Sequence, residues 1–375
     1  MEMSSKTQNN PSIRFKGFTD AWEQRELKEI LKVNSGRDYK HLGSGSIPVY
    51  GTGGYMLSVN DKLSDKDAIG IGRKGTIDKP QYLKAPFWTV DTLFFMIPLN
   101  NFDLQFLYTM TQKINWKKMD ESTGVPSLSK AVIEKVNQNI PSYQEQIKIG
   151  GFFKQLDNTI ALHQRKLTLF NQLKETYLKQ MFPQNEENMP VLRFADFSEP
   201  WEQRKLGDTV QITMGQSPNG ENYTDNPRDH ILVQGNADMK NGRVCPRVWT
   251  TQVTKKADPE DIILSVRAPV GDVGRTDYAV VLGRGVAGIK GNAFIFQTLS
   301  RMKEQGFWTR YSSGSTFESI NSADLKDAFI QICHIEEQTK IGDFFTKLDD
   351  TIALHQSKLQ KLAELKKTLL AKMLV

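Results

Sequence analysis

The sequence predicts an α+β protein: two mixed α/β globules in a pseudo-two-fold tandem repeat, joined by two long helices. Three observations predict this. A phrase near the start of the chain returns halfway along it, a longer segment recurs almost unchanged, and apolar residues in that segment follow a heptad spacing. The chain of 375 residues is also longer than a single hydrophobic core usually supports, which favours more than one domain.

The shorter repeat opens each half of the chain. Residues 13–27 read IRFKGFTDAWEQREL, and residues 192–206 read LRFADFSEPWEQRKL. The longer repeat comes later in each half: residues 145–167 (EQIKIGGFFKQLDNTIALHQRKL) and residues 337–359 (EQTKIGDFFTKLDDTIALHQSKL) are identical at 17 of 23 positions. Chance does not produce such agreement, so we infer two copies of one unit.

The longer repeat has the pattern of a helix. Its seam residues alternate between spacings of four and three, and no proline interrupts 143–182 or 335–375, which predicts one long helix in each range. A narrow apolar stripe needs a partner, and we expect the two helices to pack against each other as a coiled coil. Packing of each helix on its own globule remains the alternative. The predicted seam consists of Ile149, Phe153, Leu156, Ile160, His163, Leu167, Ile341, Phe345, Leu348, Ile352, His355 and Leu359.

The rest of the chain divides into two variable blocks, 11–142 and 191–334, with a linker at 183–190 between prolines. Short β-rich runs alternate with Gly- and Pro-rich turns in both blocks, which predicts mixed globular domains. The blocks agree only in scattered places. Residues 69–73 (IGIGR) resemble residues 263–267 (ILSVR), and we expect these two segments to occupy matching positions.

Composition excludes several classes of protein. The formal net charge of +6 is compatible with a polyanionic partner, and no apolar run approaches the roughly 20 residues of a membrane span. The first eleven residues are polar, unlike a secretory signal. Two cysteines, Cys245 and Cys333, are too few for a disulfide scaffold or a four-thiolate metal site. We therefore expect a cytoplasmic protein without a membrane partner.

No motif predicts catalysis. Residues 70–75 (GIGRKG) match the dinucleotide-binding pattern G-x-G-x-x-G, but Pro80 follows closely and makes the required helix improbable. The segment either offers Arg73 and Lys74 to phosphates or bases, or is a tight turn with solvated charges. A Walker A sequence and an amino-methyltransferase signature are absent, and the five histidines lack metal-ligand spacing. We expect no catalytic residue, no metal site and no cofactor bound by this chain.

Cations and an aromatic residue of the two blocks are candidates for DNA contact. The fork of arginine fits the major-groove edge of guanine, although about half of any such set is ordinary solvated surface. The candidates are Tyr55, Arg73, Lys74, Lys79, Lys117, Arg228, Arg243, Arg247, Arg267 and Arg284.

Over essentially the whole chain, the sequence resembles the specificity subunits of type I restriction-modification systems. The motifs that carry the resemblance are WEQR at 22–25 and 201–204, LD-x-TIALHQ at 156–164 and 348–356, IPVYGTGG at 47–54 and GRKG at 72–75. The duplicated helix is the most specific of these; the glycine-rich stretches alone would be weak.

The resemblance implies a function. The variable blocks would be target-recognition domains that each read one half of a bipartite site in double-stranded DNA. The two long helices would form an antiparallel coiled coil that sets the spacing. They would also dock two modification (methyltransferase) subunits, which restriction (helicase/nuclease) subunits join. S-adenosylmethionine, ATP and Mg would then be bound by those partner subunits. Recognition domains vary between members of the family, so no base-reading residue can be transferred.

Two other functions compete with this interpretation. An autonomous DNA-modifying enzyme would need a methyl-donor or nuclease motif, and methylation by the purified chain would reveal it. A plain coiled-coil scaffold would need neither divergent globules nor their cations, and a salt-titrated DNA-binding measurement would identify it.

Overall fold

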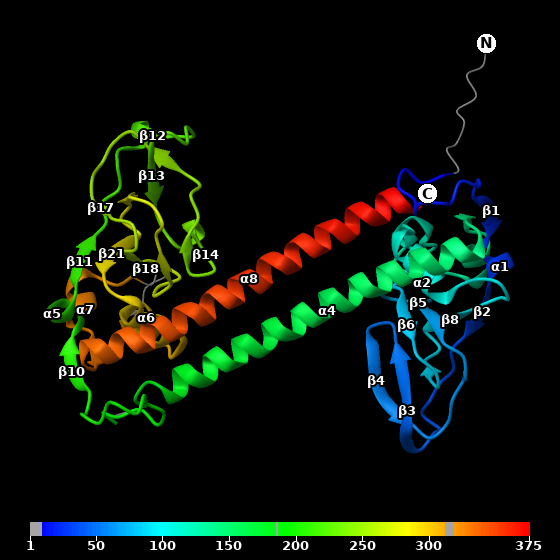
Figure 1. Ribbon diagram of the computed structural model, residues 1–375, viewed down its shortest axis with the longest axis horizontal. Coiled ribbons are helices and arrows are strands. Elements are labelled where there is room, and N and C mark those ends of the chain that lie inside the picture. Colours follow the sequence, from blue (N-terminus) through cyan, green and yellow to red (C-terminus); the bar gives the residue numbers. More distant parts are fainter. Residues whose placement is uncertain (1–9, 185–186, 312–318) are drawn as a thin grey trace, which may run out of the picture. The chain divides into compact units, whose positions relative to one another are not determined.

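The computed structural model describes residues 10–184, 187–311 and 319–375 (Figure 1). The chain forms two compact units. The first unit is residues 1–164 together with 358–375, and the second unit is residues 165–357. The units differ from the halves of the sequence repeat, because each unit contains one globule and parts of both long helices.

The first unit contains three small sheets. Their strand orders are β2-β8-β5-β6, β4-β3-β7 and β1-β9, and β3 runs parallel to β7. The strands are β1 (Glu23–Glu26), β2 (Leu31–Ser35), β3 (Ser44–Gly51), β4 (Gly54–Val59), β5 (Ala68–Gly72), β6 (Gln81–Leu83), β7 (Trp88–Thr89), β8 (Leu93–Pro98) and β9 (Asn137–Ile140). The short helices are α1 (Leu27–Ile30), α2 (Leu104–Lys113) and α3 (Lys130–Glu134), with a 3-10 turn at Trp116–Met119.

The core of the first unit lies between the four-stranded sheet and its helices. Helix α2 begins at Asp103, whose carboxylate accepts a hydrogen bond from the Phe106 amide at 2.7 Å. Phe106 then packs edge-on against Trp22, with ring centroids 6.0 Å apart. The buried residues Ile149 and Phe153 of the long helix complete this core.

The second unit repeats the plan with more strands. Its sheets have the orders β11-β21-β18-β19-β15-β14, β12-β16-β13-β20-β17 and β10-β22. The strands are β10 (Glu202–Lys205), β11 (Gln211–Met214), β12 (Tyr223–Thr224), β13 (His230–Val233), β14 (Met239–Lys240), β15 (Arg243–Val244), β16 (Trp249–Thr250), β17 (Lys256–Ala257), β18 (Ile262–Ser265), β19 (Val273–Arg275), β20 (Val280–Leu282), β21 (Val286–Lys290) and β22 (Phe329–Ile332). The short helices are α5 (Leu206–Thr209), α6 (Ala293–Glu304) and α7 (Ser322–Asp327), with 3-10 turns at Gly220–Asn222, Asn236–Asp238 and Phe307–Tyr311.

Strand pairing shows that the two globules share one fold. In the first unit β5 pairs with β8, and in the second β18 pairs with β21, so that the pair Ile69–Met96 matches the pair Ile262–Ile289. The parallel pairs β3–β7 and β13–β20 match in the same way. The sequence predicts two copies of a mixed α/β globule, and the matching strand pairs confirm that prediction.

One sequence alignment is wrong by a single residue. The expected match of 69–73 with 263–267 makes Arg267 the counterpart of Arg73, whereas the strand registers make it the counterpart of Lys74. Two isolated bridges agree with the registers, since Lys74 pairs with Ser127 and Arg267 with Ser319. The slip matters because a shift of one residue moves a strand side chain to the opposite face.

The long helices are α4 (Tyr143–Gln180) and α8 (Ile335–Met373), each two residues shorter at its end than expected. The reason for the earlier end of α4 is tertiary packing. Met181 and Phe182 are buried in the second unit's core, where Phe182 stacks on Phe294 at 5.3 Å between ring centroids. Similarly, Leu374 is buried in the first unit's core just after α8 ends.

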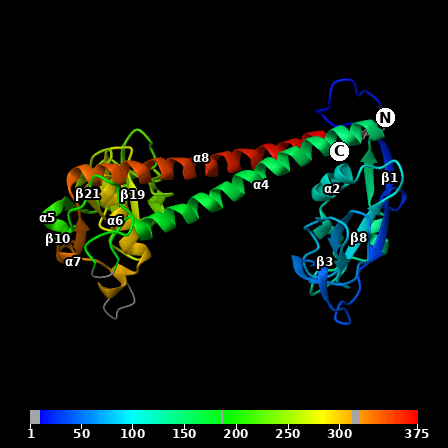
Figure 2. The ribbon, with the colours of Figure 1, turned by 60° about the horizontal axis from the view of Figure 1, so that its bottom comes forward.

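Within the second unit the two helices run in opposite directions (Figures 1 and 2). Tyr177 packs edge-on against Phe344, while Phe170, seven residues earlier in α4, meets His355, eleven residues later in α8. The heptad spacing predicts that the helices pair, and the antiparallel direction is the one that the family resemblance implies. The predicted alternative also applies, because the beginning of each helix packs on the globule that precedes it.

Two glycines let the helices approach their globules. A side-chain carbon on Gly150 of α4 would lie 2.6 Å from the Asp103 carboxylate at the start of α2. One on Gly342 of α8 would lie 2.8 Å from Ala293 at the start of α6. The seam residues have three environments. Ile149, Phe153, Leu156, Ile341 and Phe345 belong to the globule cores, Leu348, Ile352 and His355 are buried farther along α8, and Ile160, His163, Leu167 and Leu359 are half-buried.

Within the described part of the chain, no helix combines the length and apolar character needed to cross a membrane.

Candidate nucleic-acid interface

A pocket of about 710 Å³ lies in the first unit where several strands end. It is formed by the segment after β2, the turn between β3 and β4, and the segment between β7 and β8. Its lining includes the charged residues Asp38, Lys40 and Asp91 and the aromatic ring of Tyr55. We call it the acidic pocket, after Asp38 and Asp91.

Neighbouring segments fix the walls of the acidic pocket. The Gln81 side-chain amide donates hydrogen bonds to the carbonyls of Gly51 and Thr52, at 2.9 and 3.1 Å, and so holds the β3–β4 turn. Gly54 in that turn has φ +111°, a conformation that favours glycine. The result is a turn whose backbone is anchored while the Tyr55 ring stays exposed.

A pocket of about 490 Å³ lies in the second unit. Its lining includes Ser217, Gln234, Arg267 and Arg284. The arginines are exposed, and none of the described residues that line this pocket carries a carboxylate. We call it the arginine pocket, after Arg267 and Arg284.

Buried hydrogen bonds hold the arginine pocket. The Asp238 carboxylate is only 3% exposed and accepts hydrogen bonds from the amides of Gln234 and Gly235, at 2.7 and 3.2 Å. Arg247 Nε donates to the other oxygen of that carboxylate at 3.1 Å. The Arg284 amide donates to Ser217 Oγ at 3.1 Å. Both walls of the pocket are therefore set by contacts within the unit.

The two pockets occupy the same place in the shared fold. Gly72 pairs with Leu93 as Ser265 pairs with Val286, so the residues two positions before these partners, Asp91 and Arg284, correspond.

The other walls correspond as well. The pairing of β2 with β8 and of β11 with β21 matches Asp38 with Ser217, and the parallel strand pairs match Gly51 with Gln234. One position in the fold therefore carries a pocket twice, with different side chains each time.

Half of the ten candidate DNA-contacting residues fall around these pockets. Tyr55 lines the acidic pocket, and the amides of Arg73 and Lys74 both donate to the carbonyl of Thr92 on its wall, at 2.8 and 3.3 Å. Arg267 and Arg284 line the arginine pocket.

The remaining candidates lie elsewhere. Arg243 is paired with Asp277 at 2.7 Å, and Lys117 with Asp78 at 2.8 Å; the hydrogen bond from Lys117 lowers the pKa of the Asp78 carboxyl. Arg247 supports Asp238, as described above. Lys79 and Arg228 are exposed and line neither pocket.

Sequence reasoning missed the acidic residues of the first pocket. The candidates chosen from the sequence were cations and one aromatic residue. Nothing in the local sequence around Asp38 or Asp91 marks these two residues as parts of one pocket. Only the register of three separate strands brings them together. Among the described residues, neither Asp38 nor Asp91 is in an ion pair, and the same holds for Arg267 and Arg284.

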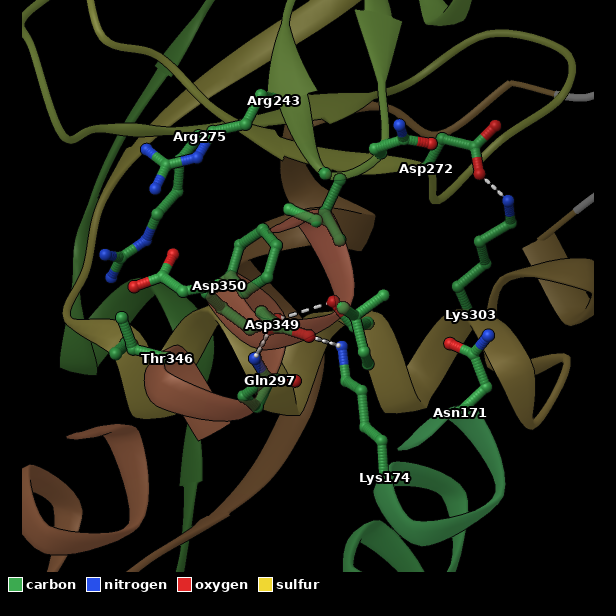
Figure 3. A pocket seen from close by; sticks show the side chains of 18 of the residues that line it. Asn171, Lys174, Arg243, Asp272, Arg275, Gln297, Lys303, Thr346, Asp349 and Asp350 are labelled. Atoms are coloured by element: carbon green, nitrogen blue, oxygen red, sulfur yellow. Dashed lines mark hydrogen bonds and ion pairs between the residues drawn. The ribbon is translucent and has the colours of Figure 1, made fainter. Parts of the chain in front are cut away.

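A third pocket, of about 410 Å³, lies in the second unit beside α6 and both long helices (Figure 3). The Asp349 carboxylate accepts hydrogen bonds from Lys174 at 2.7 Å and from the Gln297 side-chain amide at 2.8 Å. Lys303 pairs with Asp272 on the opposite side. Through Lys174, Gln297 and Asp349, the contacts in this pocket hold α4, α6 and α8 together.

The described residues contain no group of three or more His, Cys, Asp or Glu side chains that could hold a metal ion.

Comparison with known proteins identifies the family. The family model for the type I restriction modification DNA specificity domain matches residues 19–172 and, a second time, residues 198–364. Since these matches cover most of the chain, the protein belongs to this family and carries two of its domains in tandem.

Similar sequences have names consistent with that family. The chain is 28% identical over 255 residues to a putative type I restriction enzyme MjaX specificity subunit from Methanocaldococcus jannaschii, a match that covers 65% of this chain and 60% of that protein. It is 20% identical over 297 residues to the type I restriction enzyme MjaVIII specificity subunit of the same organism, covering 72% and 68%. The match thus spans less than two thirds of the first relative.

Solved structures agree on the fold. A type I restriction-modification S subunit from M. genitalium superposes with a TM-score of 0.76 at 14% identity, over 98% of this chain and 99% of that one. A chain from a structure concerned with complex assembly and conformational transition of the type I R-M system gives a TM-score of 0.52 at 20% identity, over 95% and 98%. At these identities the likeness shows the fold alone.

Proposed function

We propose that this protein is the DNA-recognition subunit of a type I restriction-modification complex, and that each globule reads one half of a bipartite site in double-stranded DNA. One observation carries the proposal: the same fold, with a pocket at the same place, occurs twice with different pocket side chains. Two copies of one scaffold with unlike pockets would recognise two unlike sequences. A pseudo-two-fold protein also suits duplex DNA, whose strands run in opposite directions.

The long helices would set the gap between the two half-sites. Residues of both helices belong to both units, and neither helix is interrupted between its ends. A length of 38 or 39 residues corresponds to about 57 Å of helix at a rise of roughly 1.5 Å per residue. An uninterrupted helix pair of this length would be stiff enough to fix the distance between the two globules.

The helices would also dock two modification (methyltransferase) subunits. The repeat leaves apolar side chains exposed at matching positions: Leu162 and Leu354 are each 52% exposed, and Tyr143 and Ile335 are exposed as well. Exposed leucines at equivalent positions of two repeats fit two copies of one partner. Restriction (helicase/nuclease) subunits would join that assembly.

In this role the chain itself is not an enzyme. The methyl donor S-adenosylmethionine, and ATP with Mg for the restriction reaction, would bind to the partner subunits. The purified chain alone is therefore expected to show no methyltransferase, nuclease or ATPase activity. Because the partner is chromosomal and invading DNA, the expected location is the cytoplasm.

Methylome mapping tests the proposal. The chain is co-expressed with the modification subunits of its own system in cells that otherwise lack DNA methylation, and methylated adenines are mapped. We expect one bipartite motif with two unlike halves, and none without the chain. Methylation by the isolated chain would instead show an autonomous enzyme. Absence of salt-sensitive DNA binding by the assembled complex would show a scaffold.

A further inference from the structure

We propose that the two equivalent pockets read opposite kinds of base edge. The acidic pocket accepts hydrogen bonds from the exocyclic amino group of cytosine or adenine, and the arginine pocket donates hydrogen bonds to N7 and O6 of guanine. This inference rests on the proposed function, and adds to it the chemistry of each half-site and the residues that read it.

The first argument is position. Asp91 and Arg284 occupy the same place relative to the paired strands, and so do Asp38 and Ser217. The backbone position is the same in both globules, while the charge of its side chain differs. This is expected of a position that contacts DNA bases and differs with the sequence it recognises. Structural residues of the repeat are instead unchanged. Glu145 and Glu337 are equivalent glutamates, and each pairs with an arginine at an equivalent position of its own half.

The second argument is the lack of ion-pair partners. Several other charges of the second globule are neutralised within it: Arg243 by Asp277, Arg247 by Asp238 and Lys290 by Asp258. Among the described residues no such partner accompanies Arg267 or Arg284, and both side chains are exposed. Groups left unpaired at a pocket are available to a ligand.

The same holds for the acidic pocket. Asp38 and Asp91 are exposed and stand outside every ion pair formed by the described residues. The Asp38 carboxylate accepts one hydrogen bond, from the Lys40 amide at 3.3 Å. It therefore keeps acceptor capacity for a partner that enters the pocket.

The third argument is hydrogen-bond chemistry. An ionised carboxylate only accepts hydrogen bonds, and a guanidinium only donates them. In the major groove the amino groups of cytosine and adenine are the donors, and N7 and O6 of guanine are a pair of acceptors that match an arginine fork. A carboxylate near DNA is also repelled by phosphates, so it excludes sequences that offer no amino group to bind it.

Nearby cations offset that repulsion in the first unit. Lys40 lines the acidic pocket, and the exposed Lys74 follows the strand that ends beside it. Contacts from these lysines to phosphates would hold the duplex without reading its sequence. The carboxylates would then supply the discrimination.

The experiment pairs protein variants with altered bases. The assembled modification complex, containing this chain, is titrated with duplexes that carry its mapped motif, in which one base at a time is replaced. Guanine is replaced by 7-deazaguanine, which lacks the N7 acceptor. Cytosine is replaced by pyrimidin-2-one and adenine by purine, which lack the amino group. The pocket variants are Arg267→Ala, Arg284→Ala, Asp38→Ala and Asp91→Ala, all at exposed positions.

For the unaltered complex, we expect the loss of one base contact to weaken binding by roughly 5- to 150-fold, the range for one good base contact. At one guanine of one half-site this penalty should disappear in an arginine variant and persist in both aspartate variants. At one cytosine or adenine of the other half-site the pattern should be reversed. Matched controls are Arg204→Ala and Asp61→Ala, exposed charges that line neither pocket and should keep every penalty.

Two results would overturn the inference. Penalties that persist in all four pocket variants would show that the pockets do not read bases. Arginine variants that weaken all duplexes alike, with a smaller salt slope, would show contacts to phosphate. Either result leaves the proposed function standing, because that proposal fails only if the complex methylates no bipartite motif.

Discussion

Lys174 of α4 pairs with Asp349 of α8 across the helix pair of the second unit, with 2.7 Å between Nζ and Oδ1. The first unit contains the mirrored pair, in which Lys366 of α8 lies 2.6 Å from Asp157 of α4. The lysines occupy matching positions near the ends of the two helices, and the aspartates occupy matching positions of the longer repeat. The helix pair is thus built alike in both units, with the roles of the helices exchanged.

Removing the Lys174–Asp349 pair should destabilise the second unit. Both side chains are mostly buried, at 22% and 32% exposure, so Lys174→Met is expected to cost about 1 kcal/mol of unfolding free energy, between surface and buried pairs. Urea unfolding of single and double variants at Lys174 and Asp349 measures the coupling. Lys179→Met, which removes a fully exposed pair with Glu175, is the control and should leave the unfolding curve unchanged. Equal effects at both lysines would contradict the prediction.

Glu145 should contribute far more to the unfolding free energy than an exposed carboxylate does. It is 1% exposed and receives two hydrogen bonds from the Arg14 guanidinium, at 2.9 and 2.6 Å. Glu145→Gln would leave that arginine without its charge partner, and we expect a loss of about 2–3 kcal/mol in unfolding free energy. Denaturant titration checks this.

Glu23→Gln is the matched control for that variant, because Glu23 and Arg25 form an exposed pair. If both substitutions shifted the unfolding midpoint equally, the buried pair would contribute no more to the unfolding free energy than the exposed pair does. Glu337, fully buried against Arg193, should respond as Glu145 does.

The helices were the most predictable part of the fold. Heptad spacing is a local pattern, so residues 145–167 and 337–359 predicted both helices and their pairing. The antiparallel direction was implied by the family resemblance and not by the spacing. The helix ends were less predictable because they depend on tertiary packing. Phe182 lies beyond the end of α4 and stacks on Phe294, which is distant in the sequence.

The candidate site was predictable only in part. Residue type alone was enough to select Tyr55, Arg267 and Arg284, because exposed arginine and aromatic side chains are typical of nucleic-acid contacts. Asp38 and Asp91 could not be found that way. Their juxtaposition depends on pairing between strands distant in sequence, and no local pattern encodes that register.

The two cysteines should react at very different rates. Burial raises the pKa of the Cys333 thiol, and the nearby negative charge of Glu337 raises it further, whereas Cys245 is exposed. Since the thiolate is the reactive form, a raised pKa slows alkylation. At pH 8.5 iodoacetamide should modify Cys245 well before Cys333, as followed by mass spectrometry. In urea the two rates should converge, and equal rates in the folded protein would count against the buried environment of Cys333.

Lengthening both helices should widen the gap between half-sites. Inserting four residues after Arg165 and four after Ser357 keeps the two helices matched, because these are equivalent positions of the longer repeat, at or next to the boundaries between the units. Four residues add about 6 Å of helix, or one to two base pairs of DNA at roughly 3.4 Å each.

Methylome mapping of that variant measures the gap directly, while the half-sites themselves should stay the same. Paired two-residue insertions are the control, because they rotate each apolar stripe by about 200° and should abolish methylation. An unchanged gap in an active four-residue variant would show that the helices do not set the spacing.

The most direct test of one globule per half-site is exchange of residues 191–334 for the corresponding block of a relative with a different target. Near-identical sequences, WEQR at the start and EQ-x-KIG beyond the end, keep both junctions intact. The exchanged chain is expressed with its modification subunits and methylated adenines are mapped. We expect one half of the bipartite motif to change and the other half to remain. A motif that changes in both halves, or in neither, would contradict recognition by independent globules.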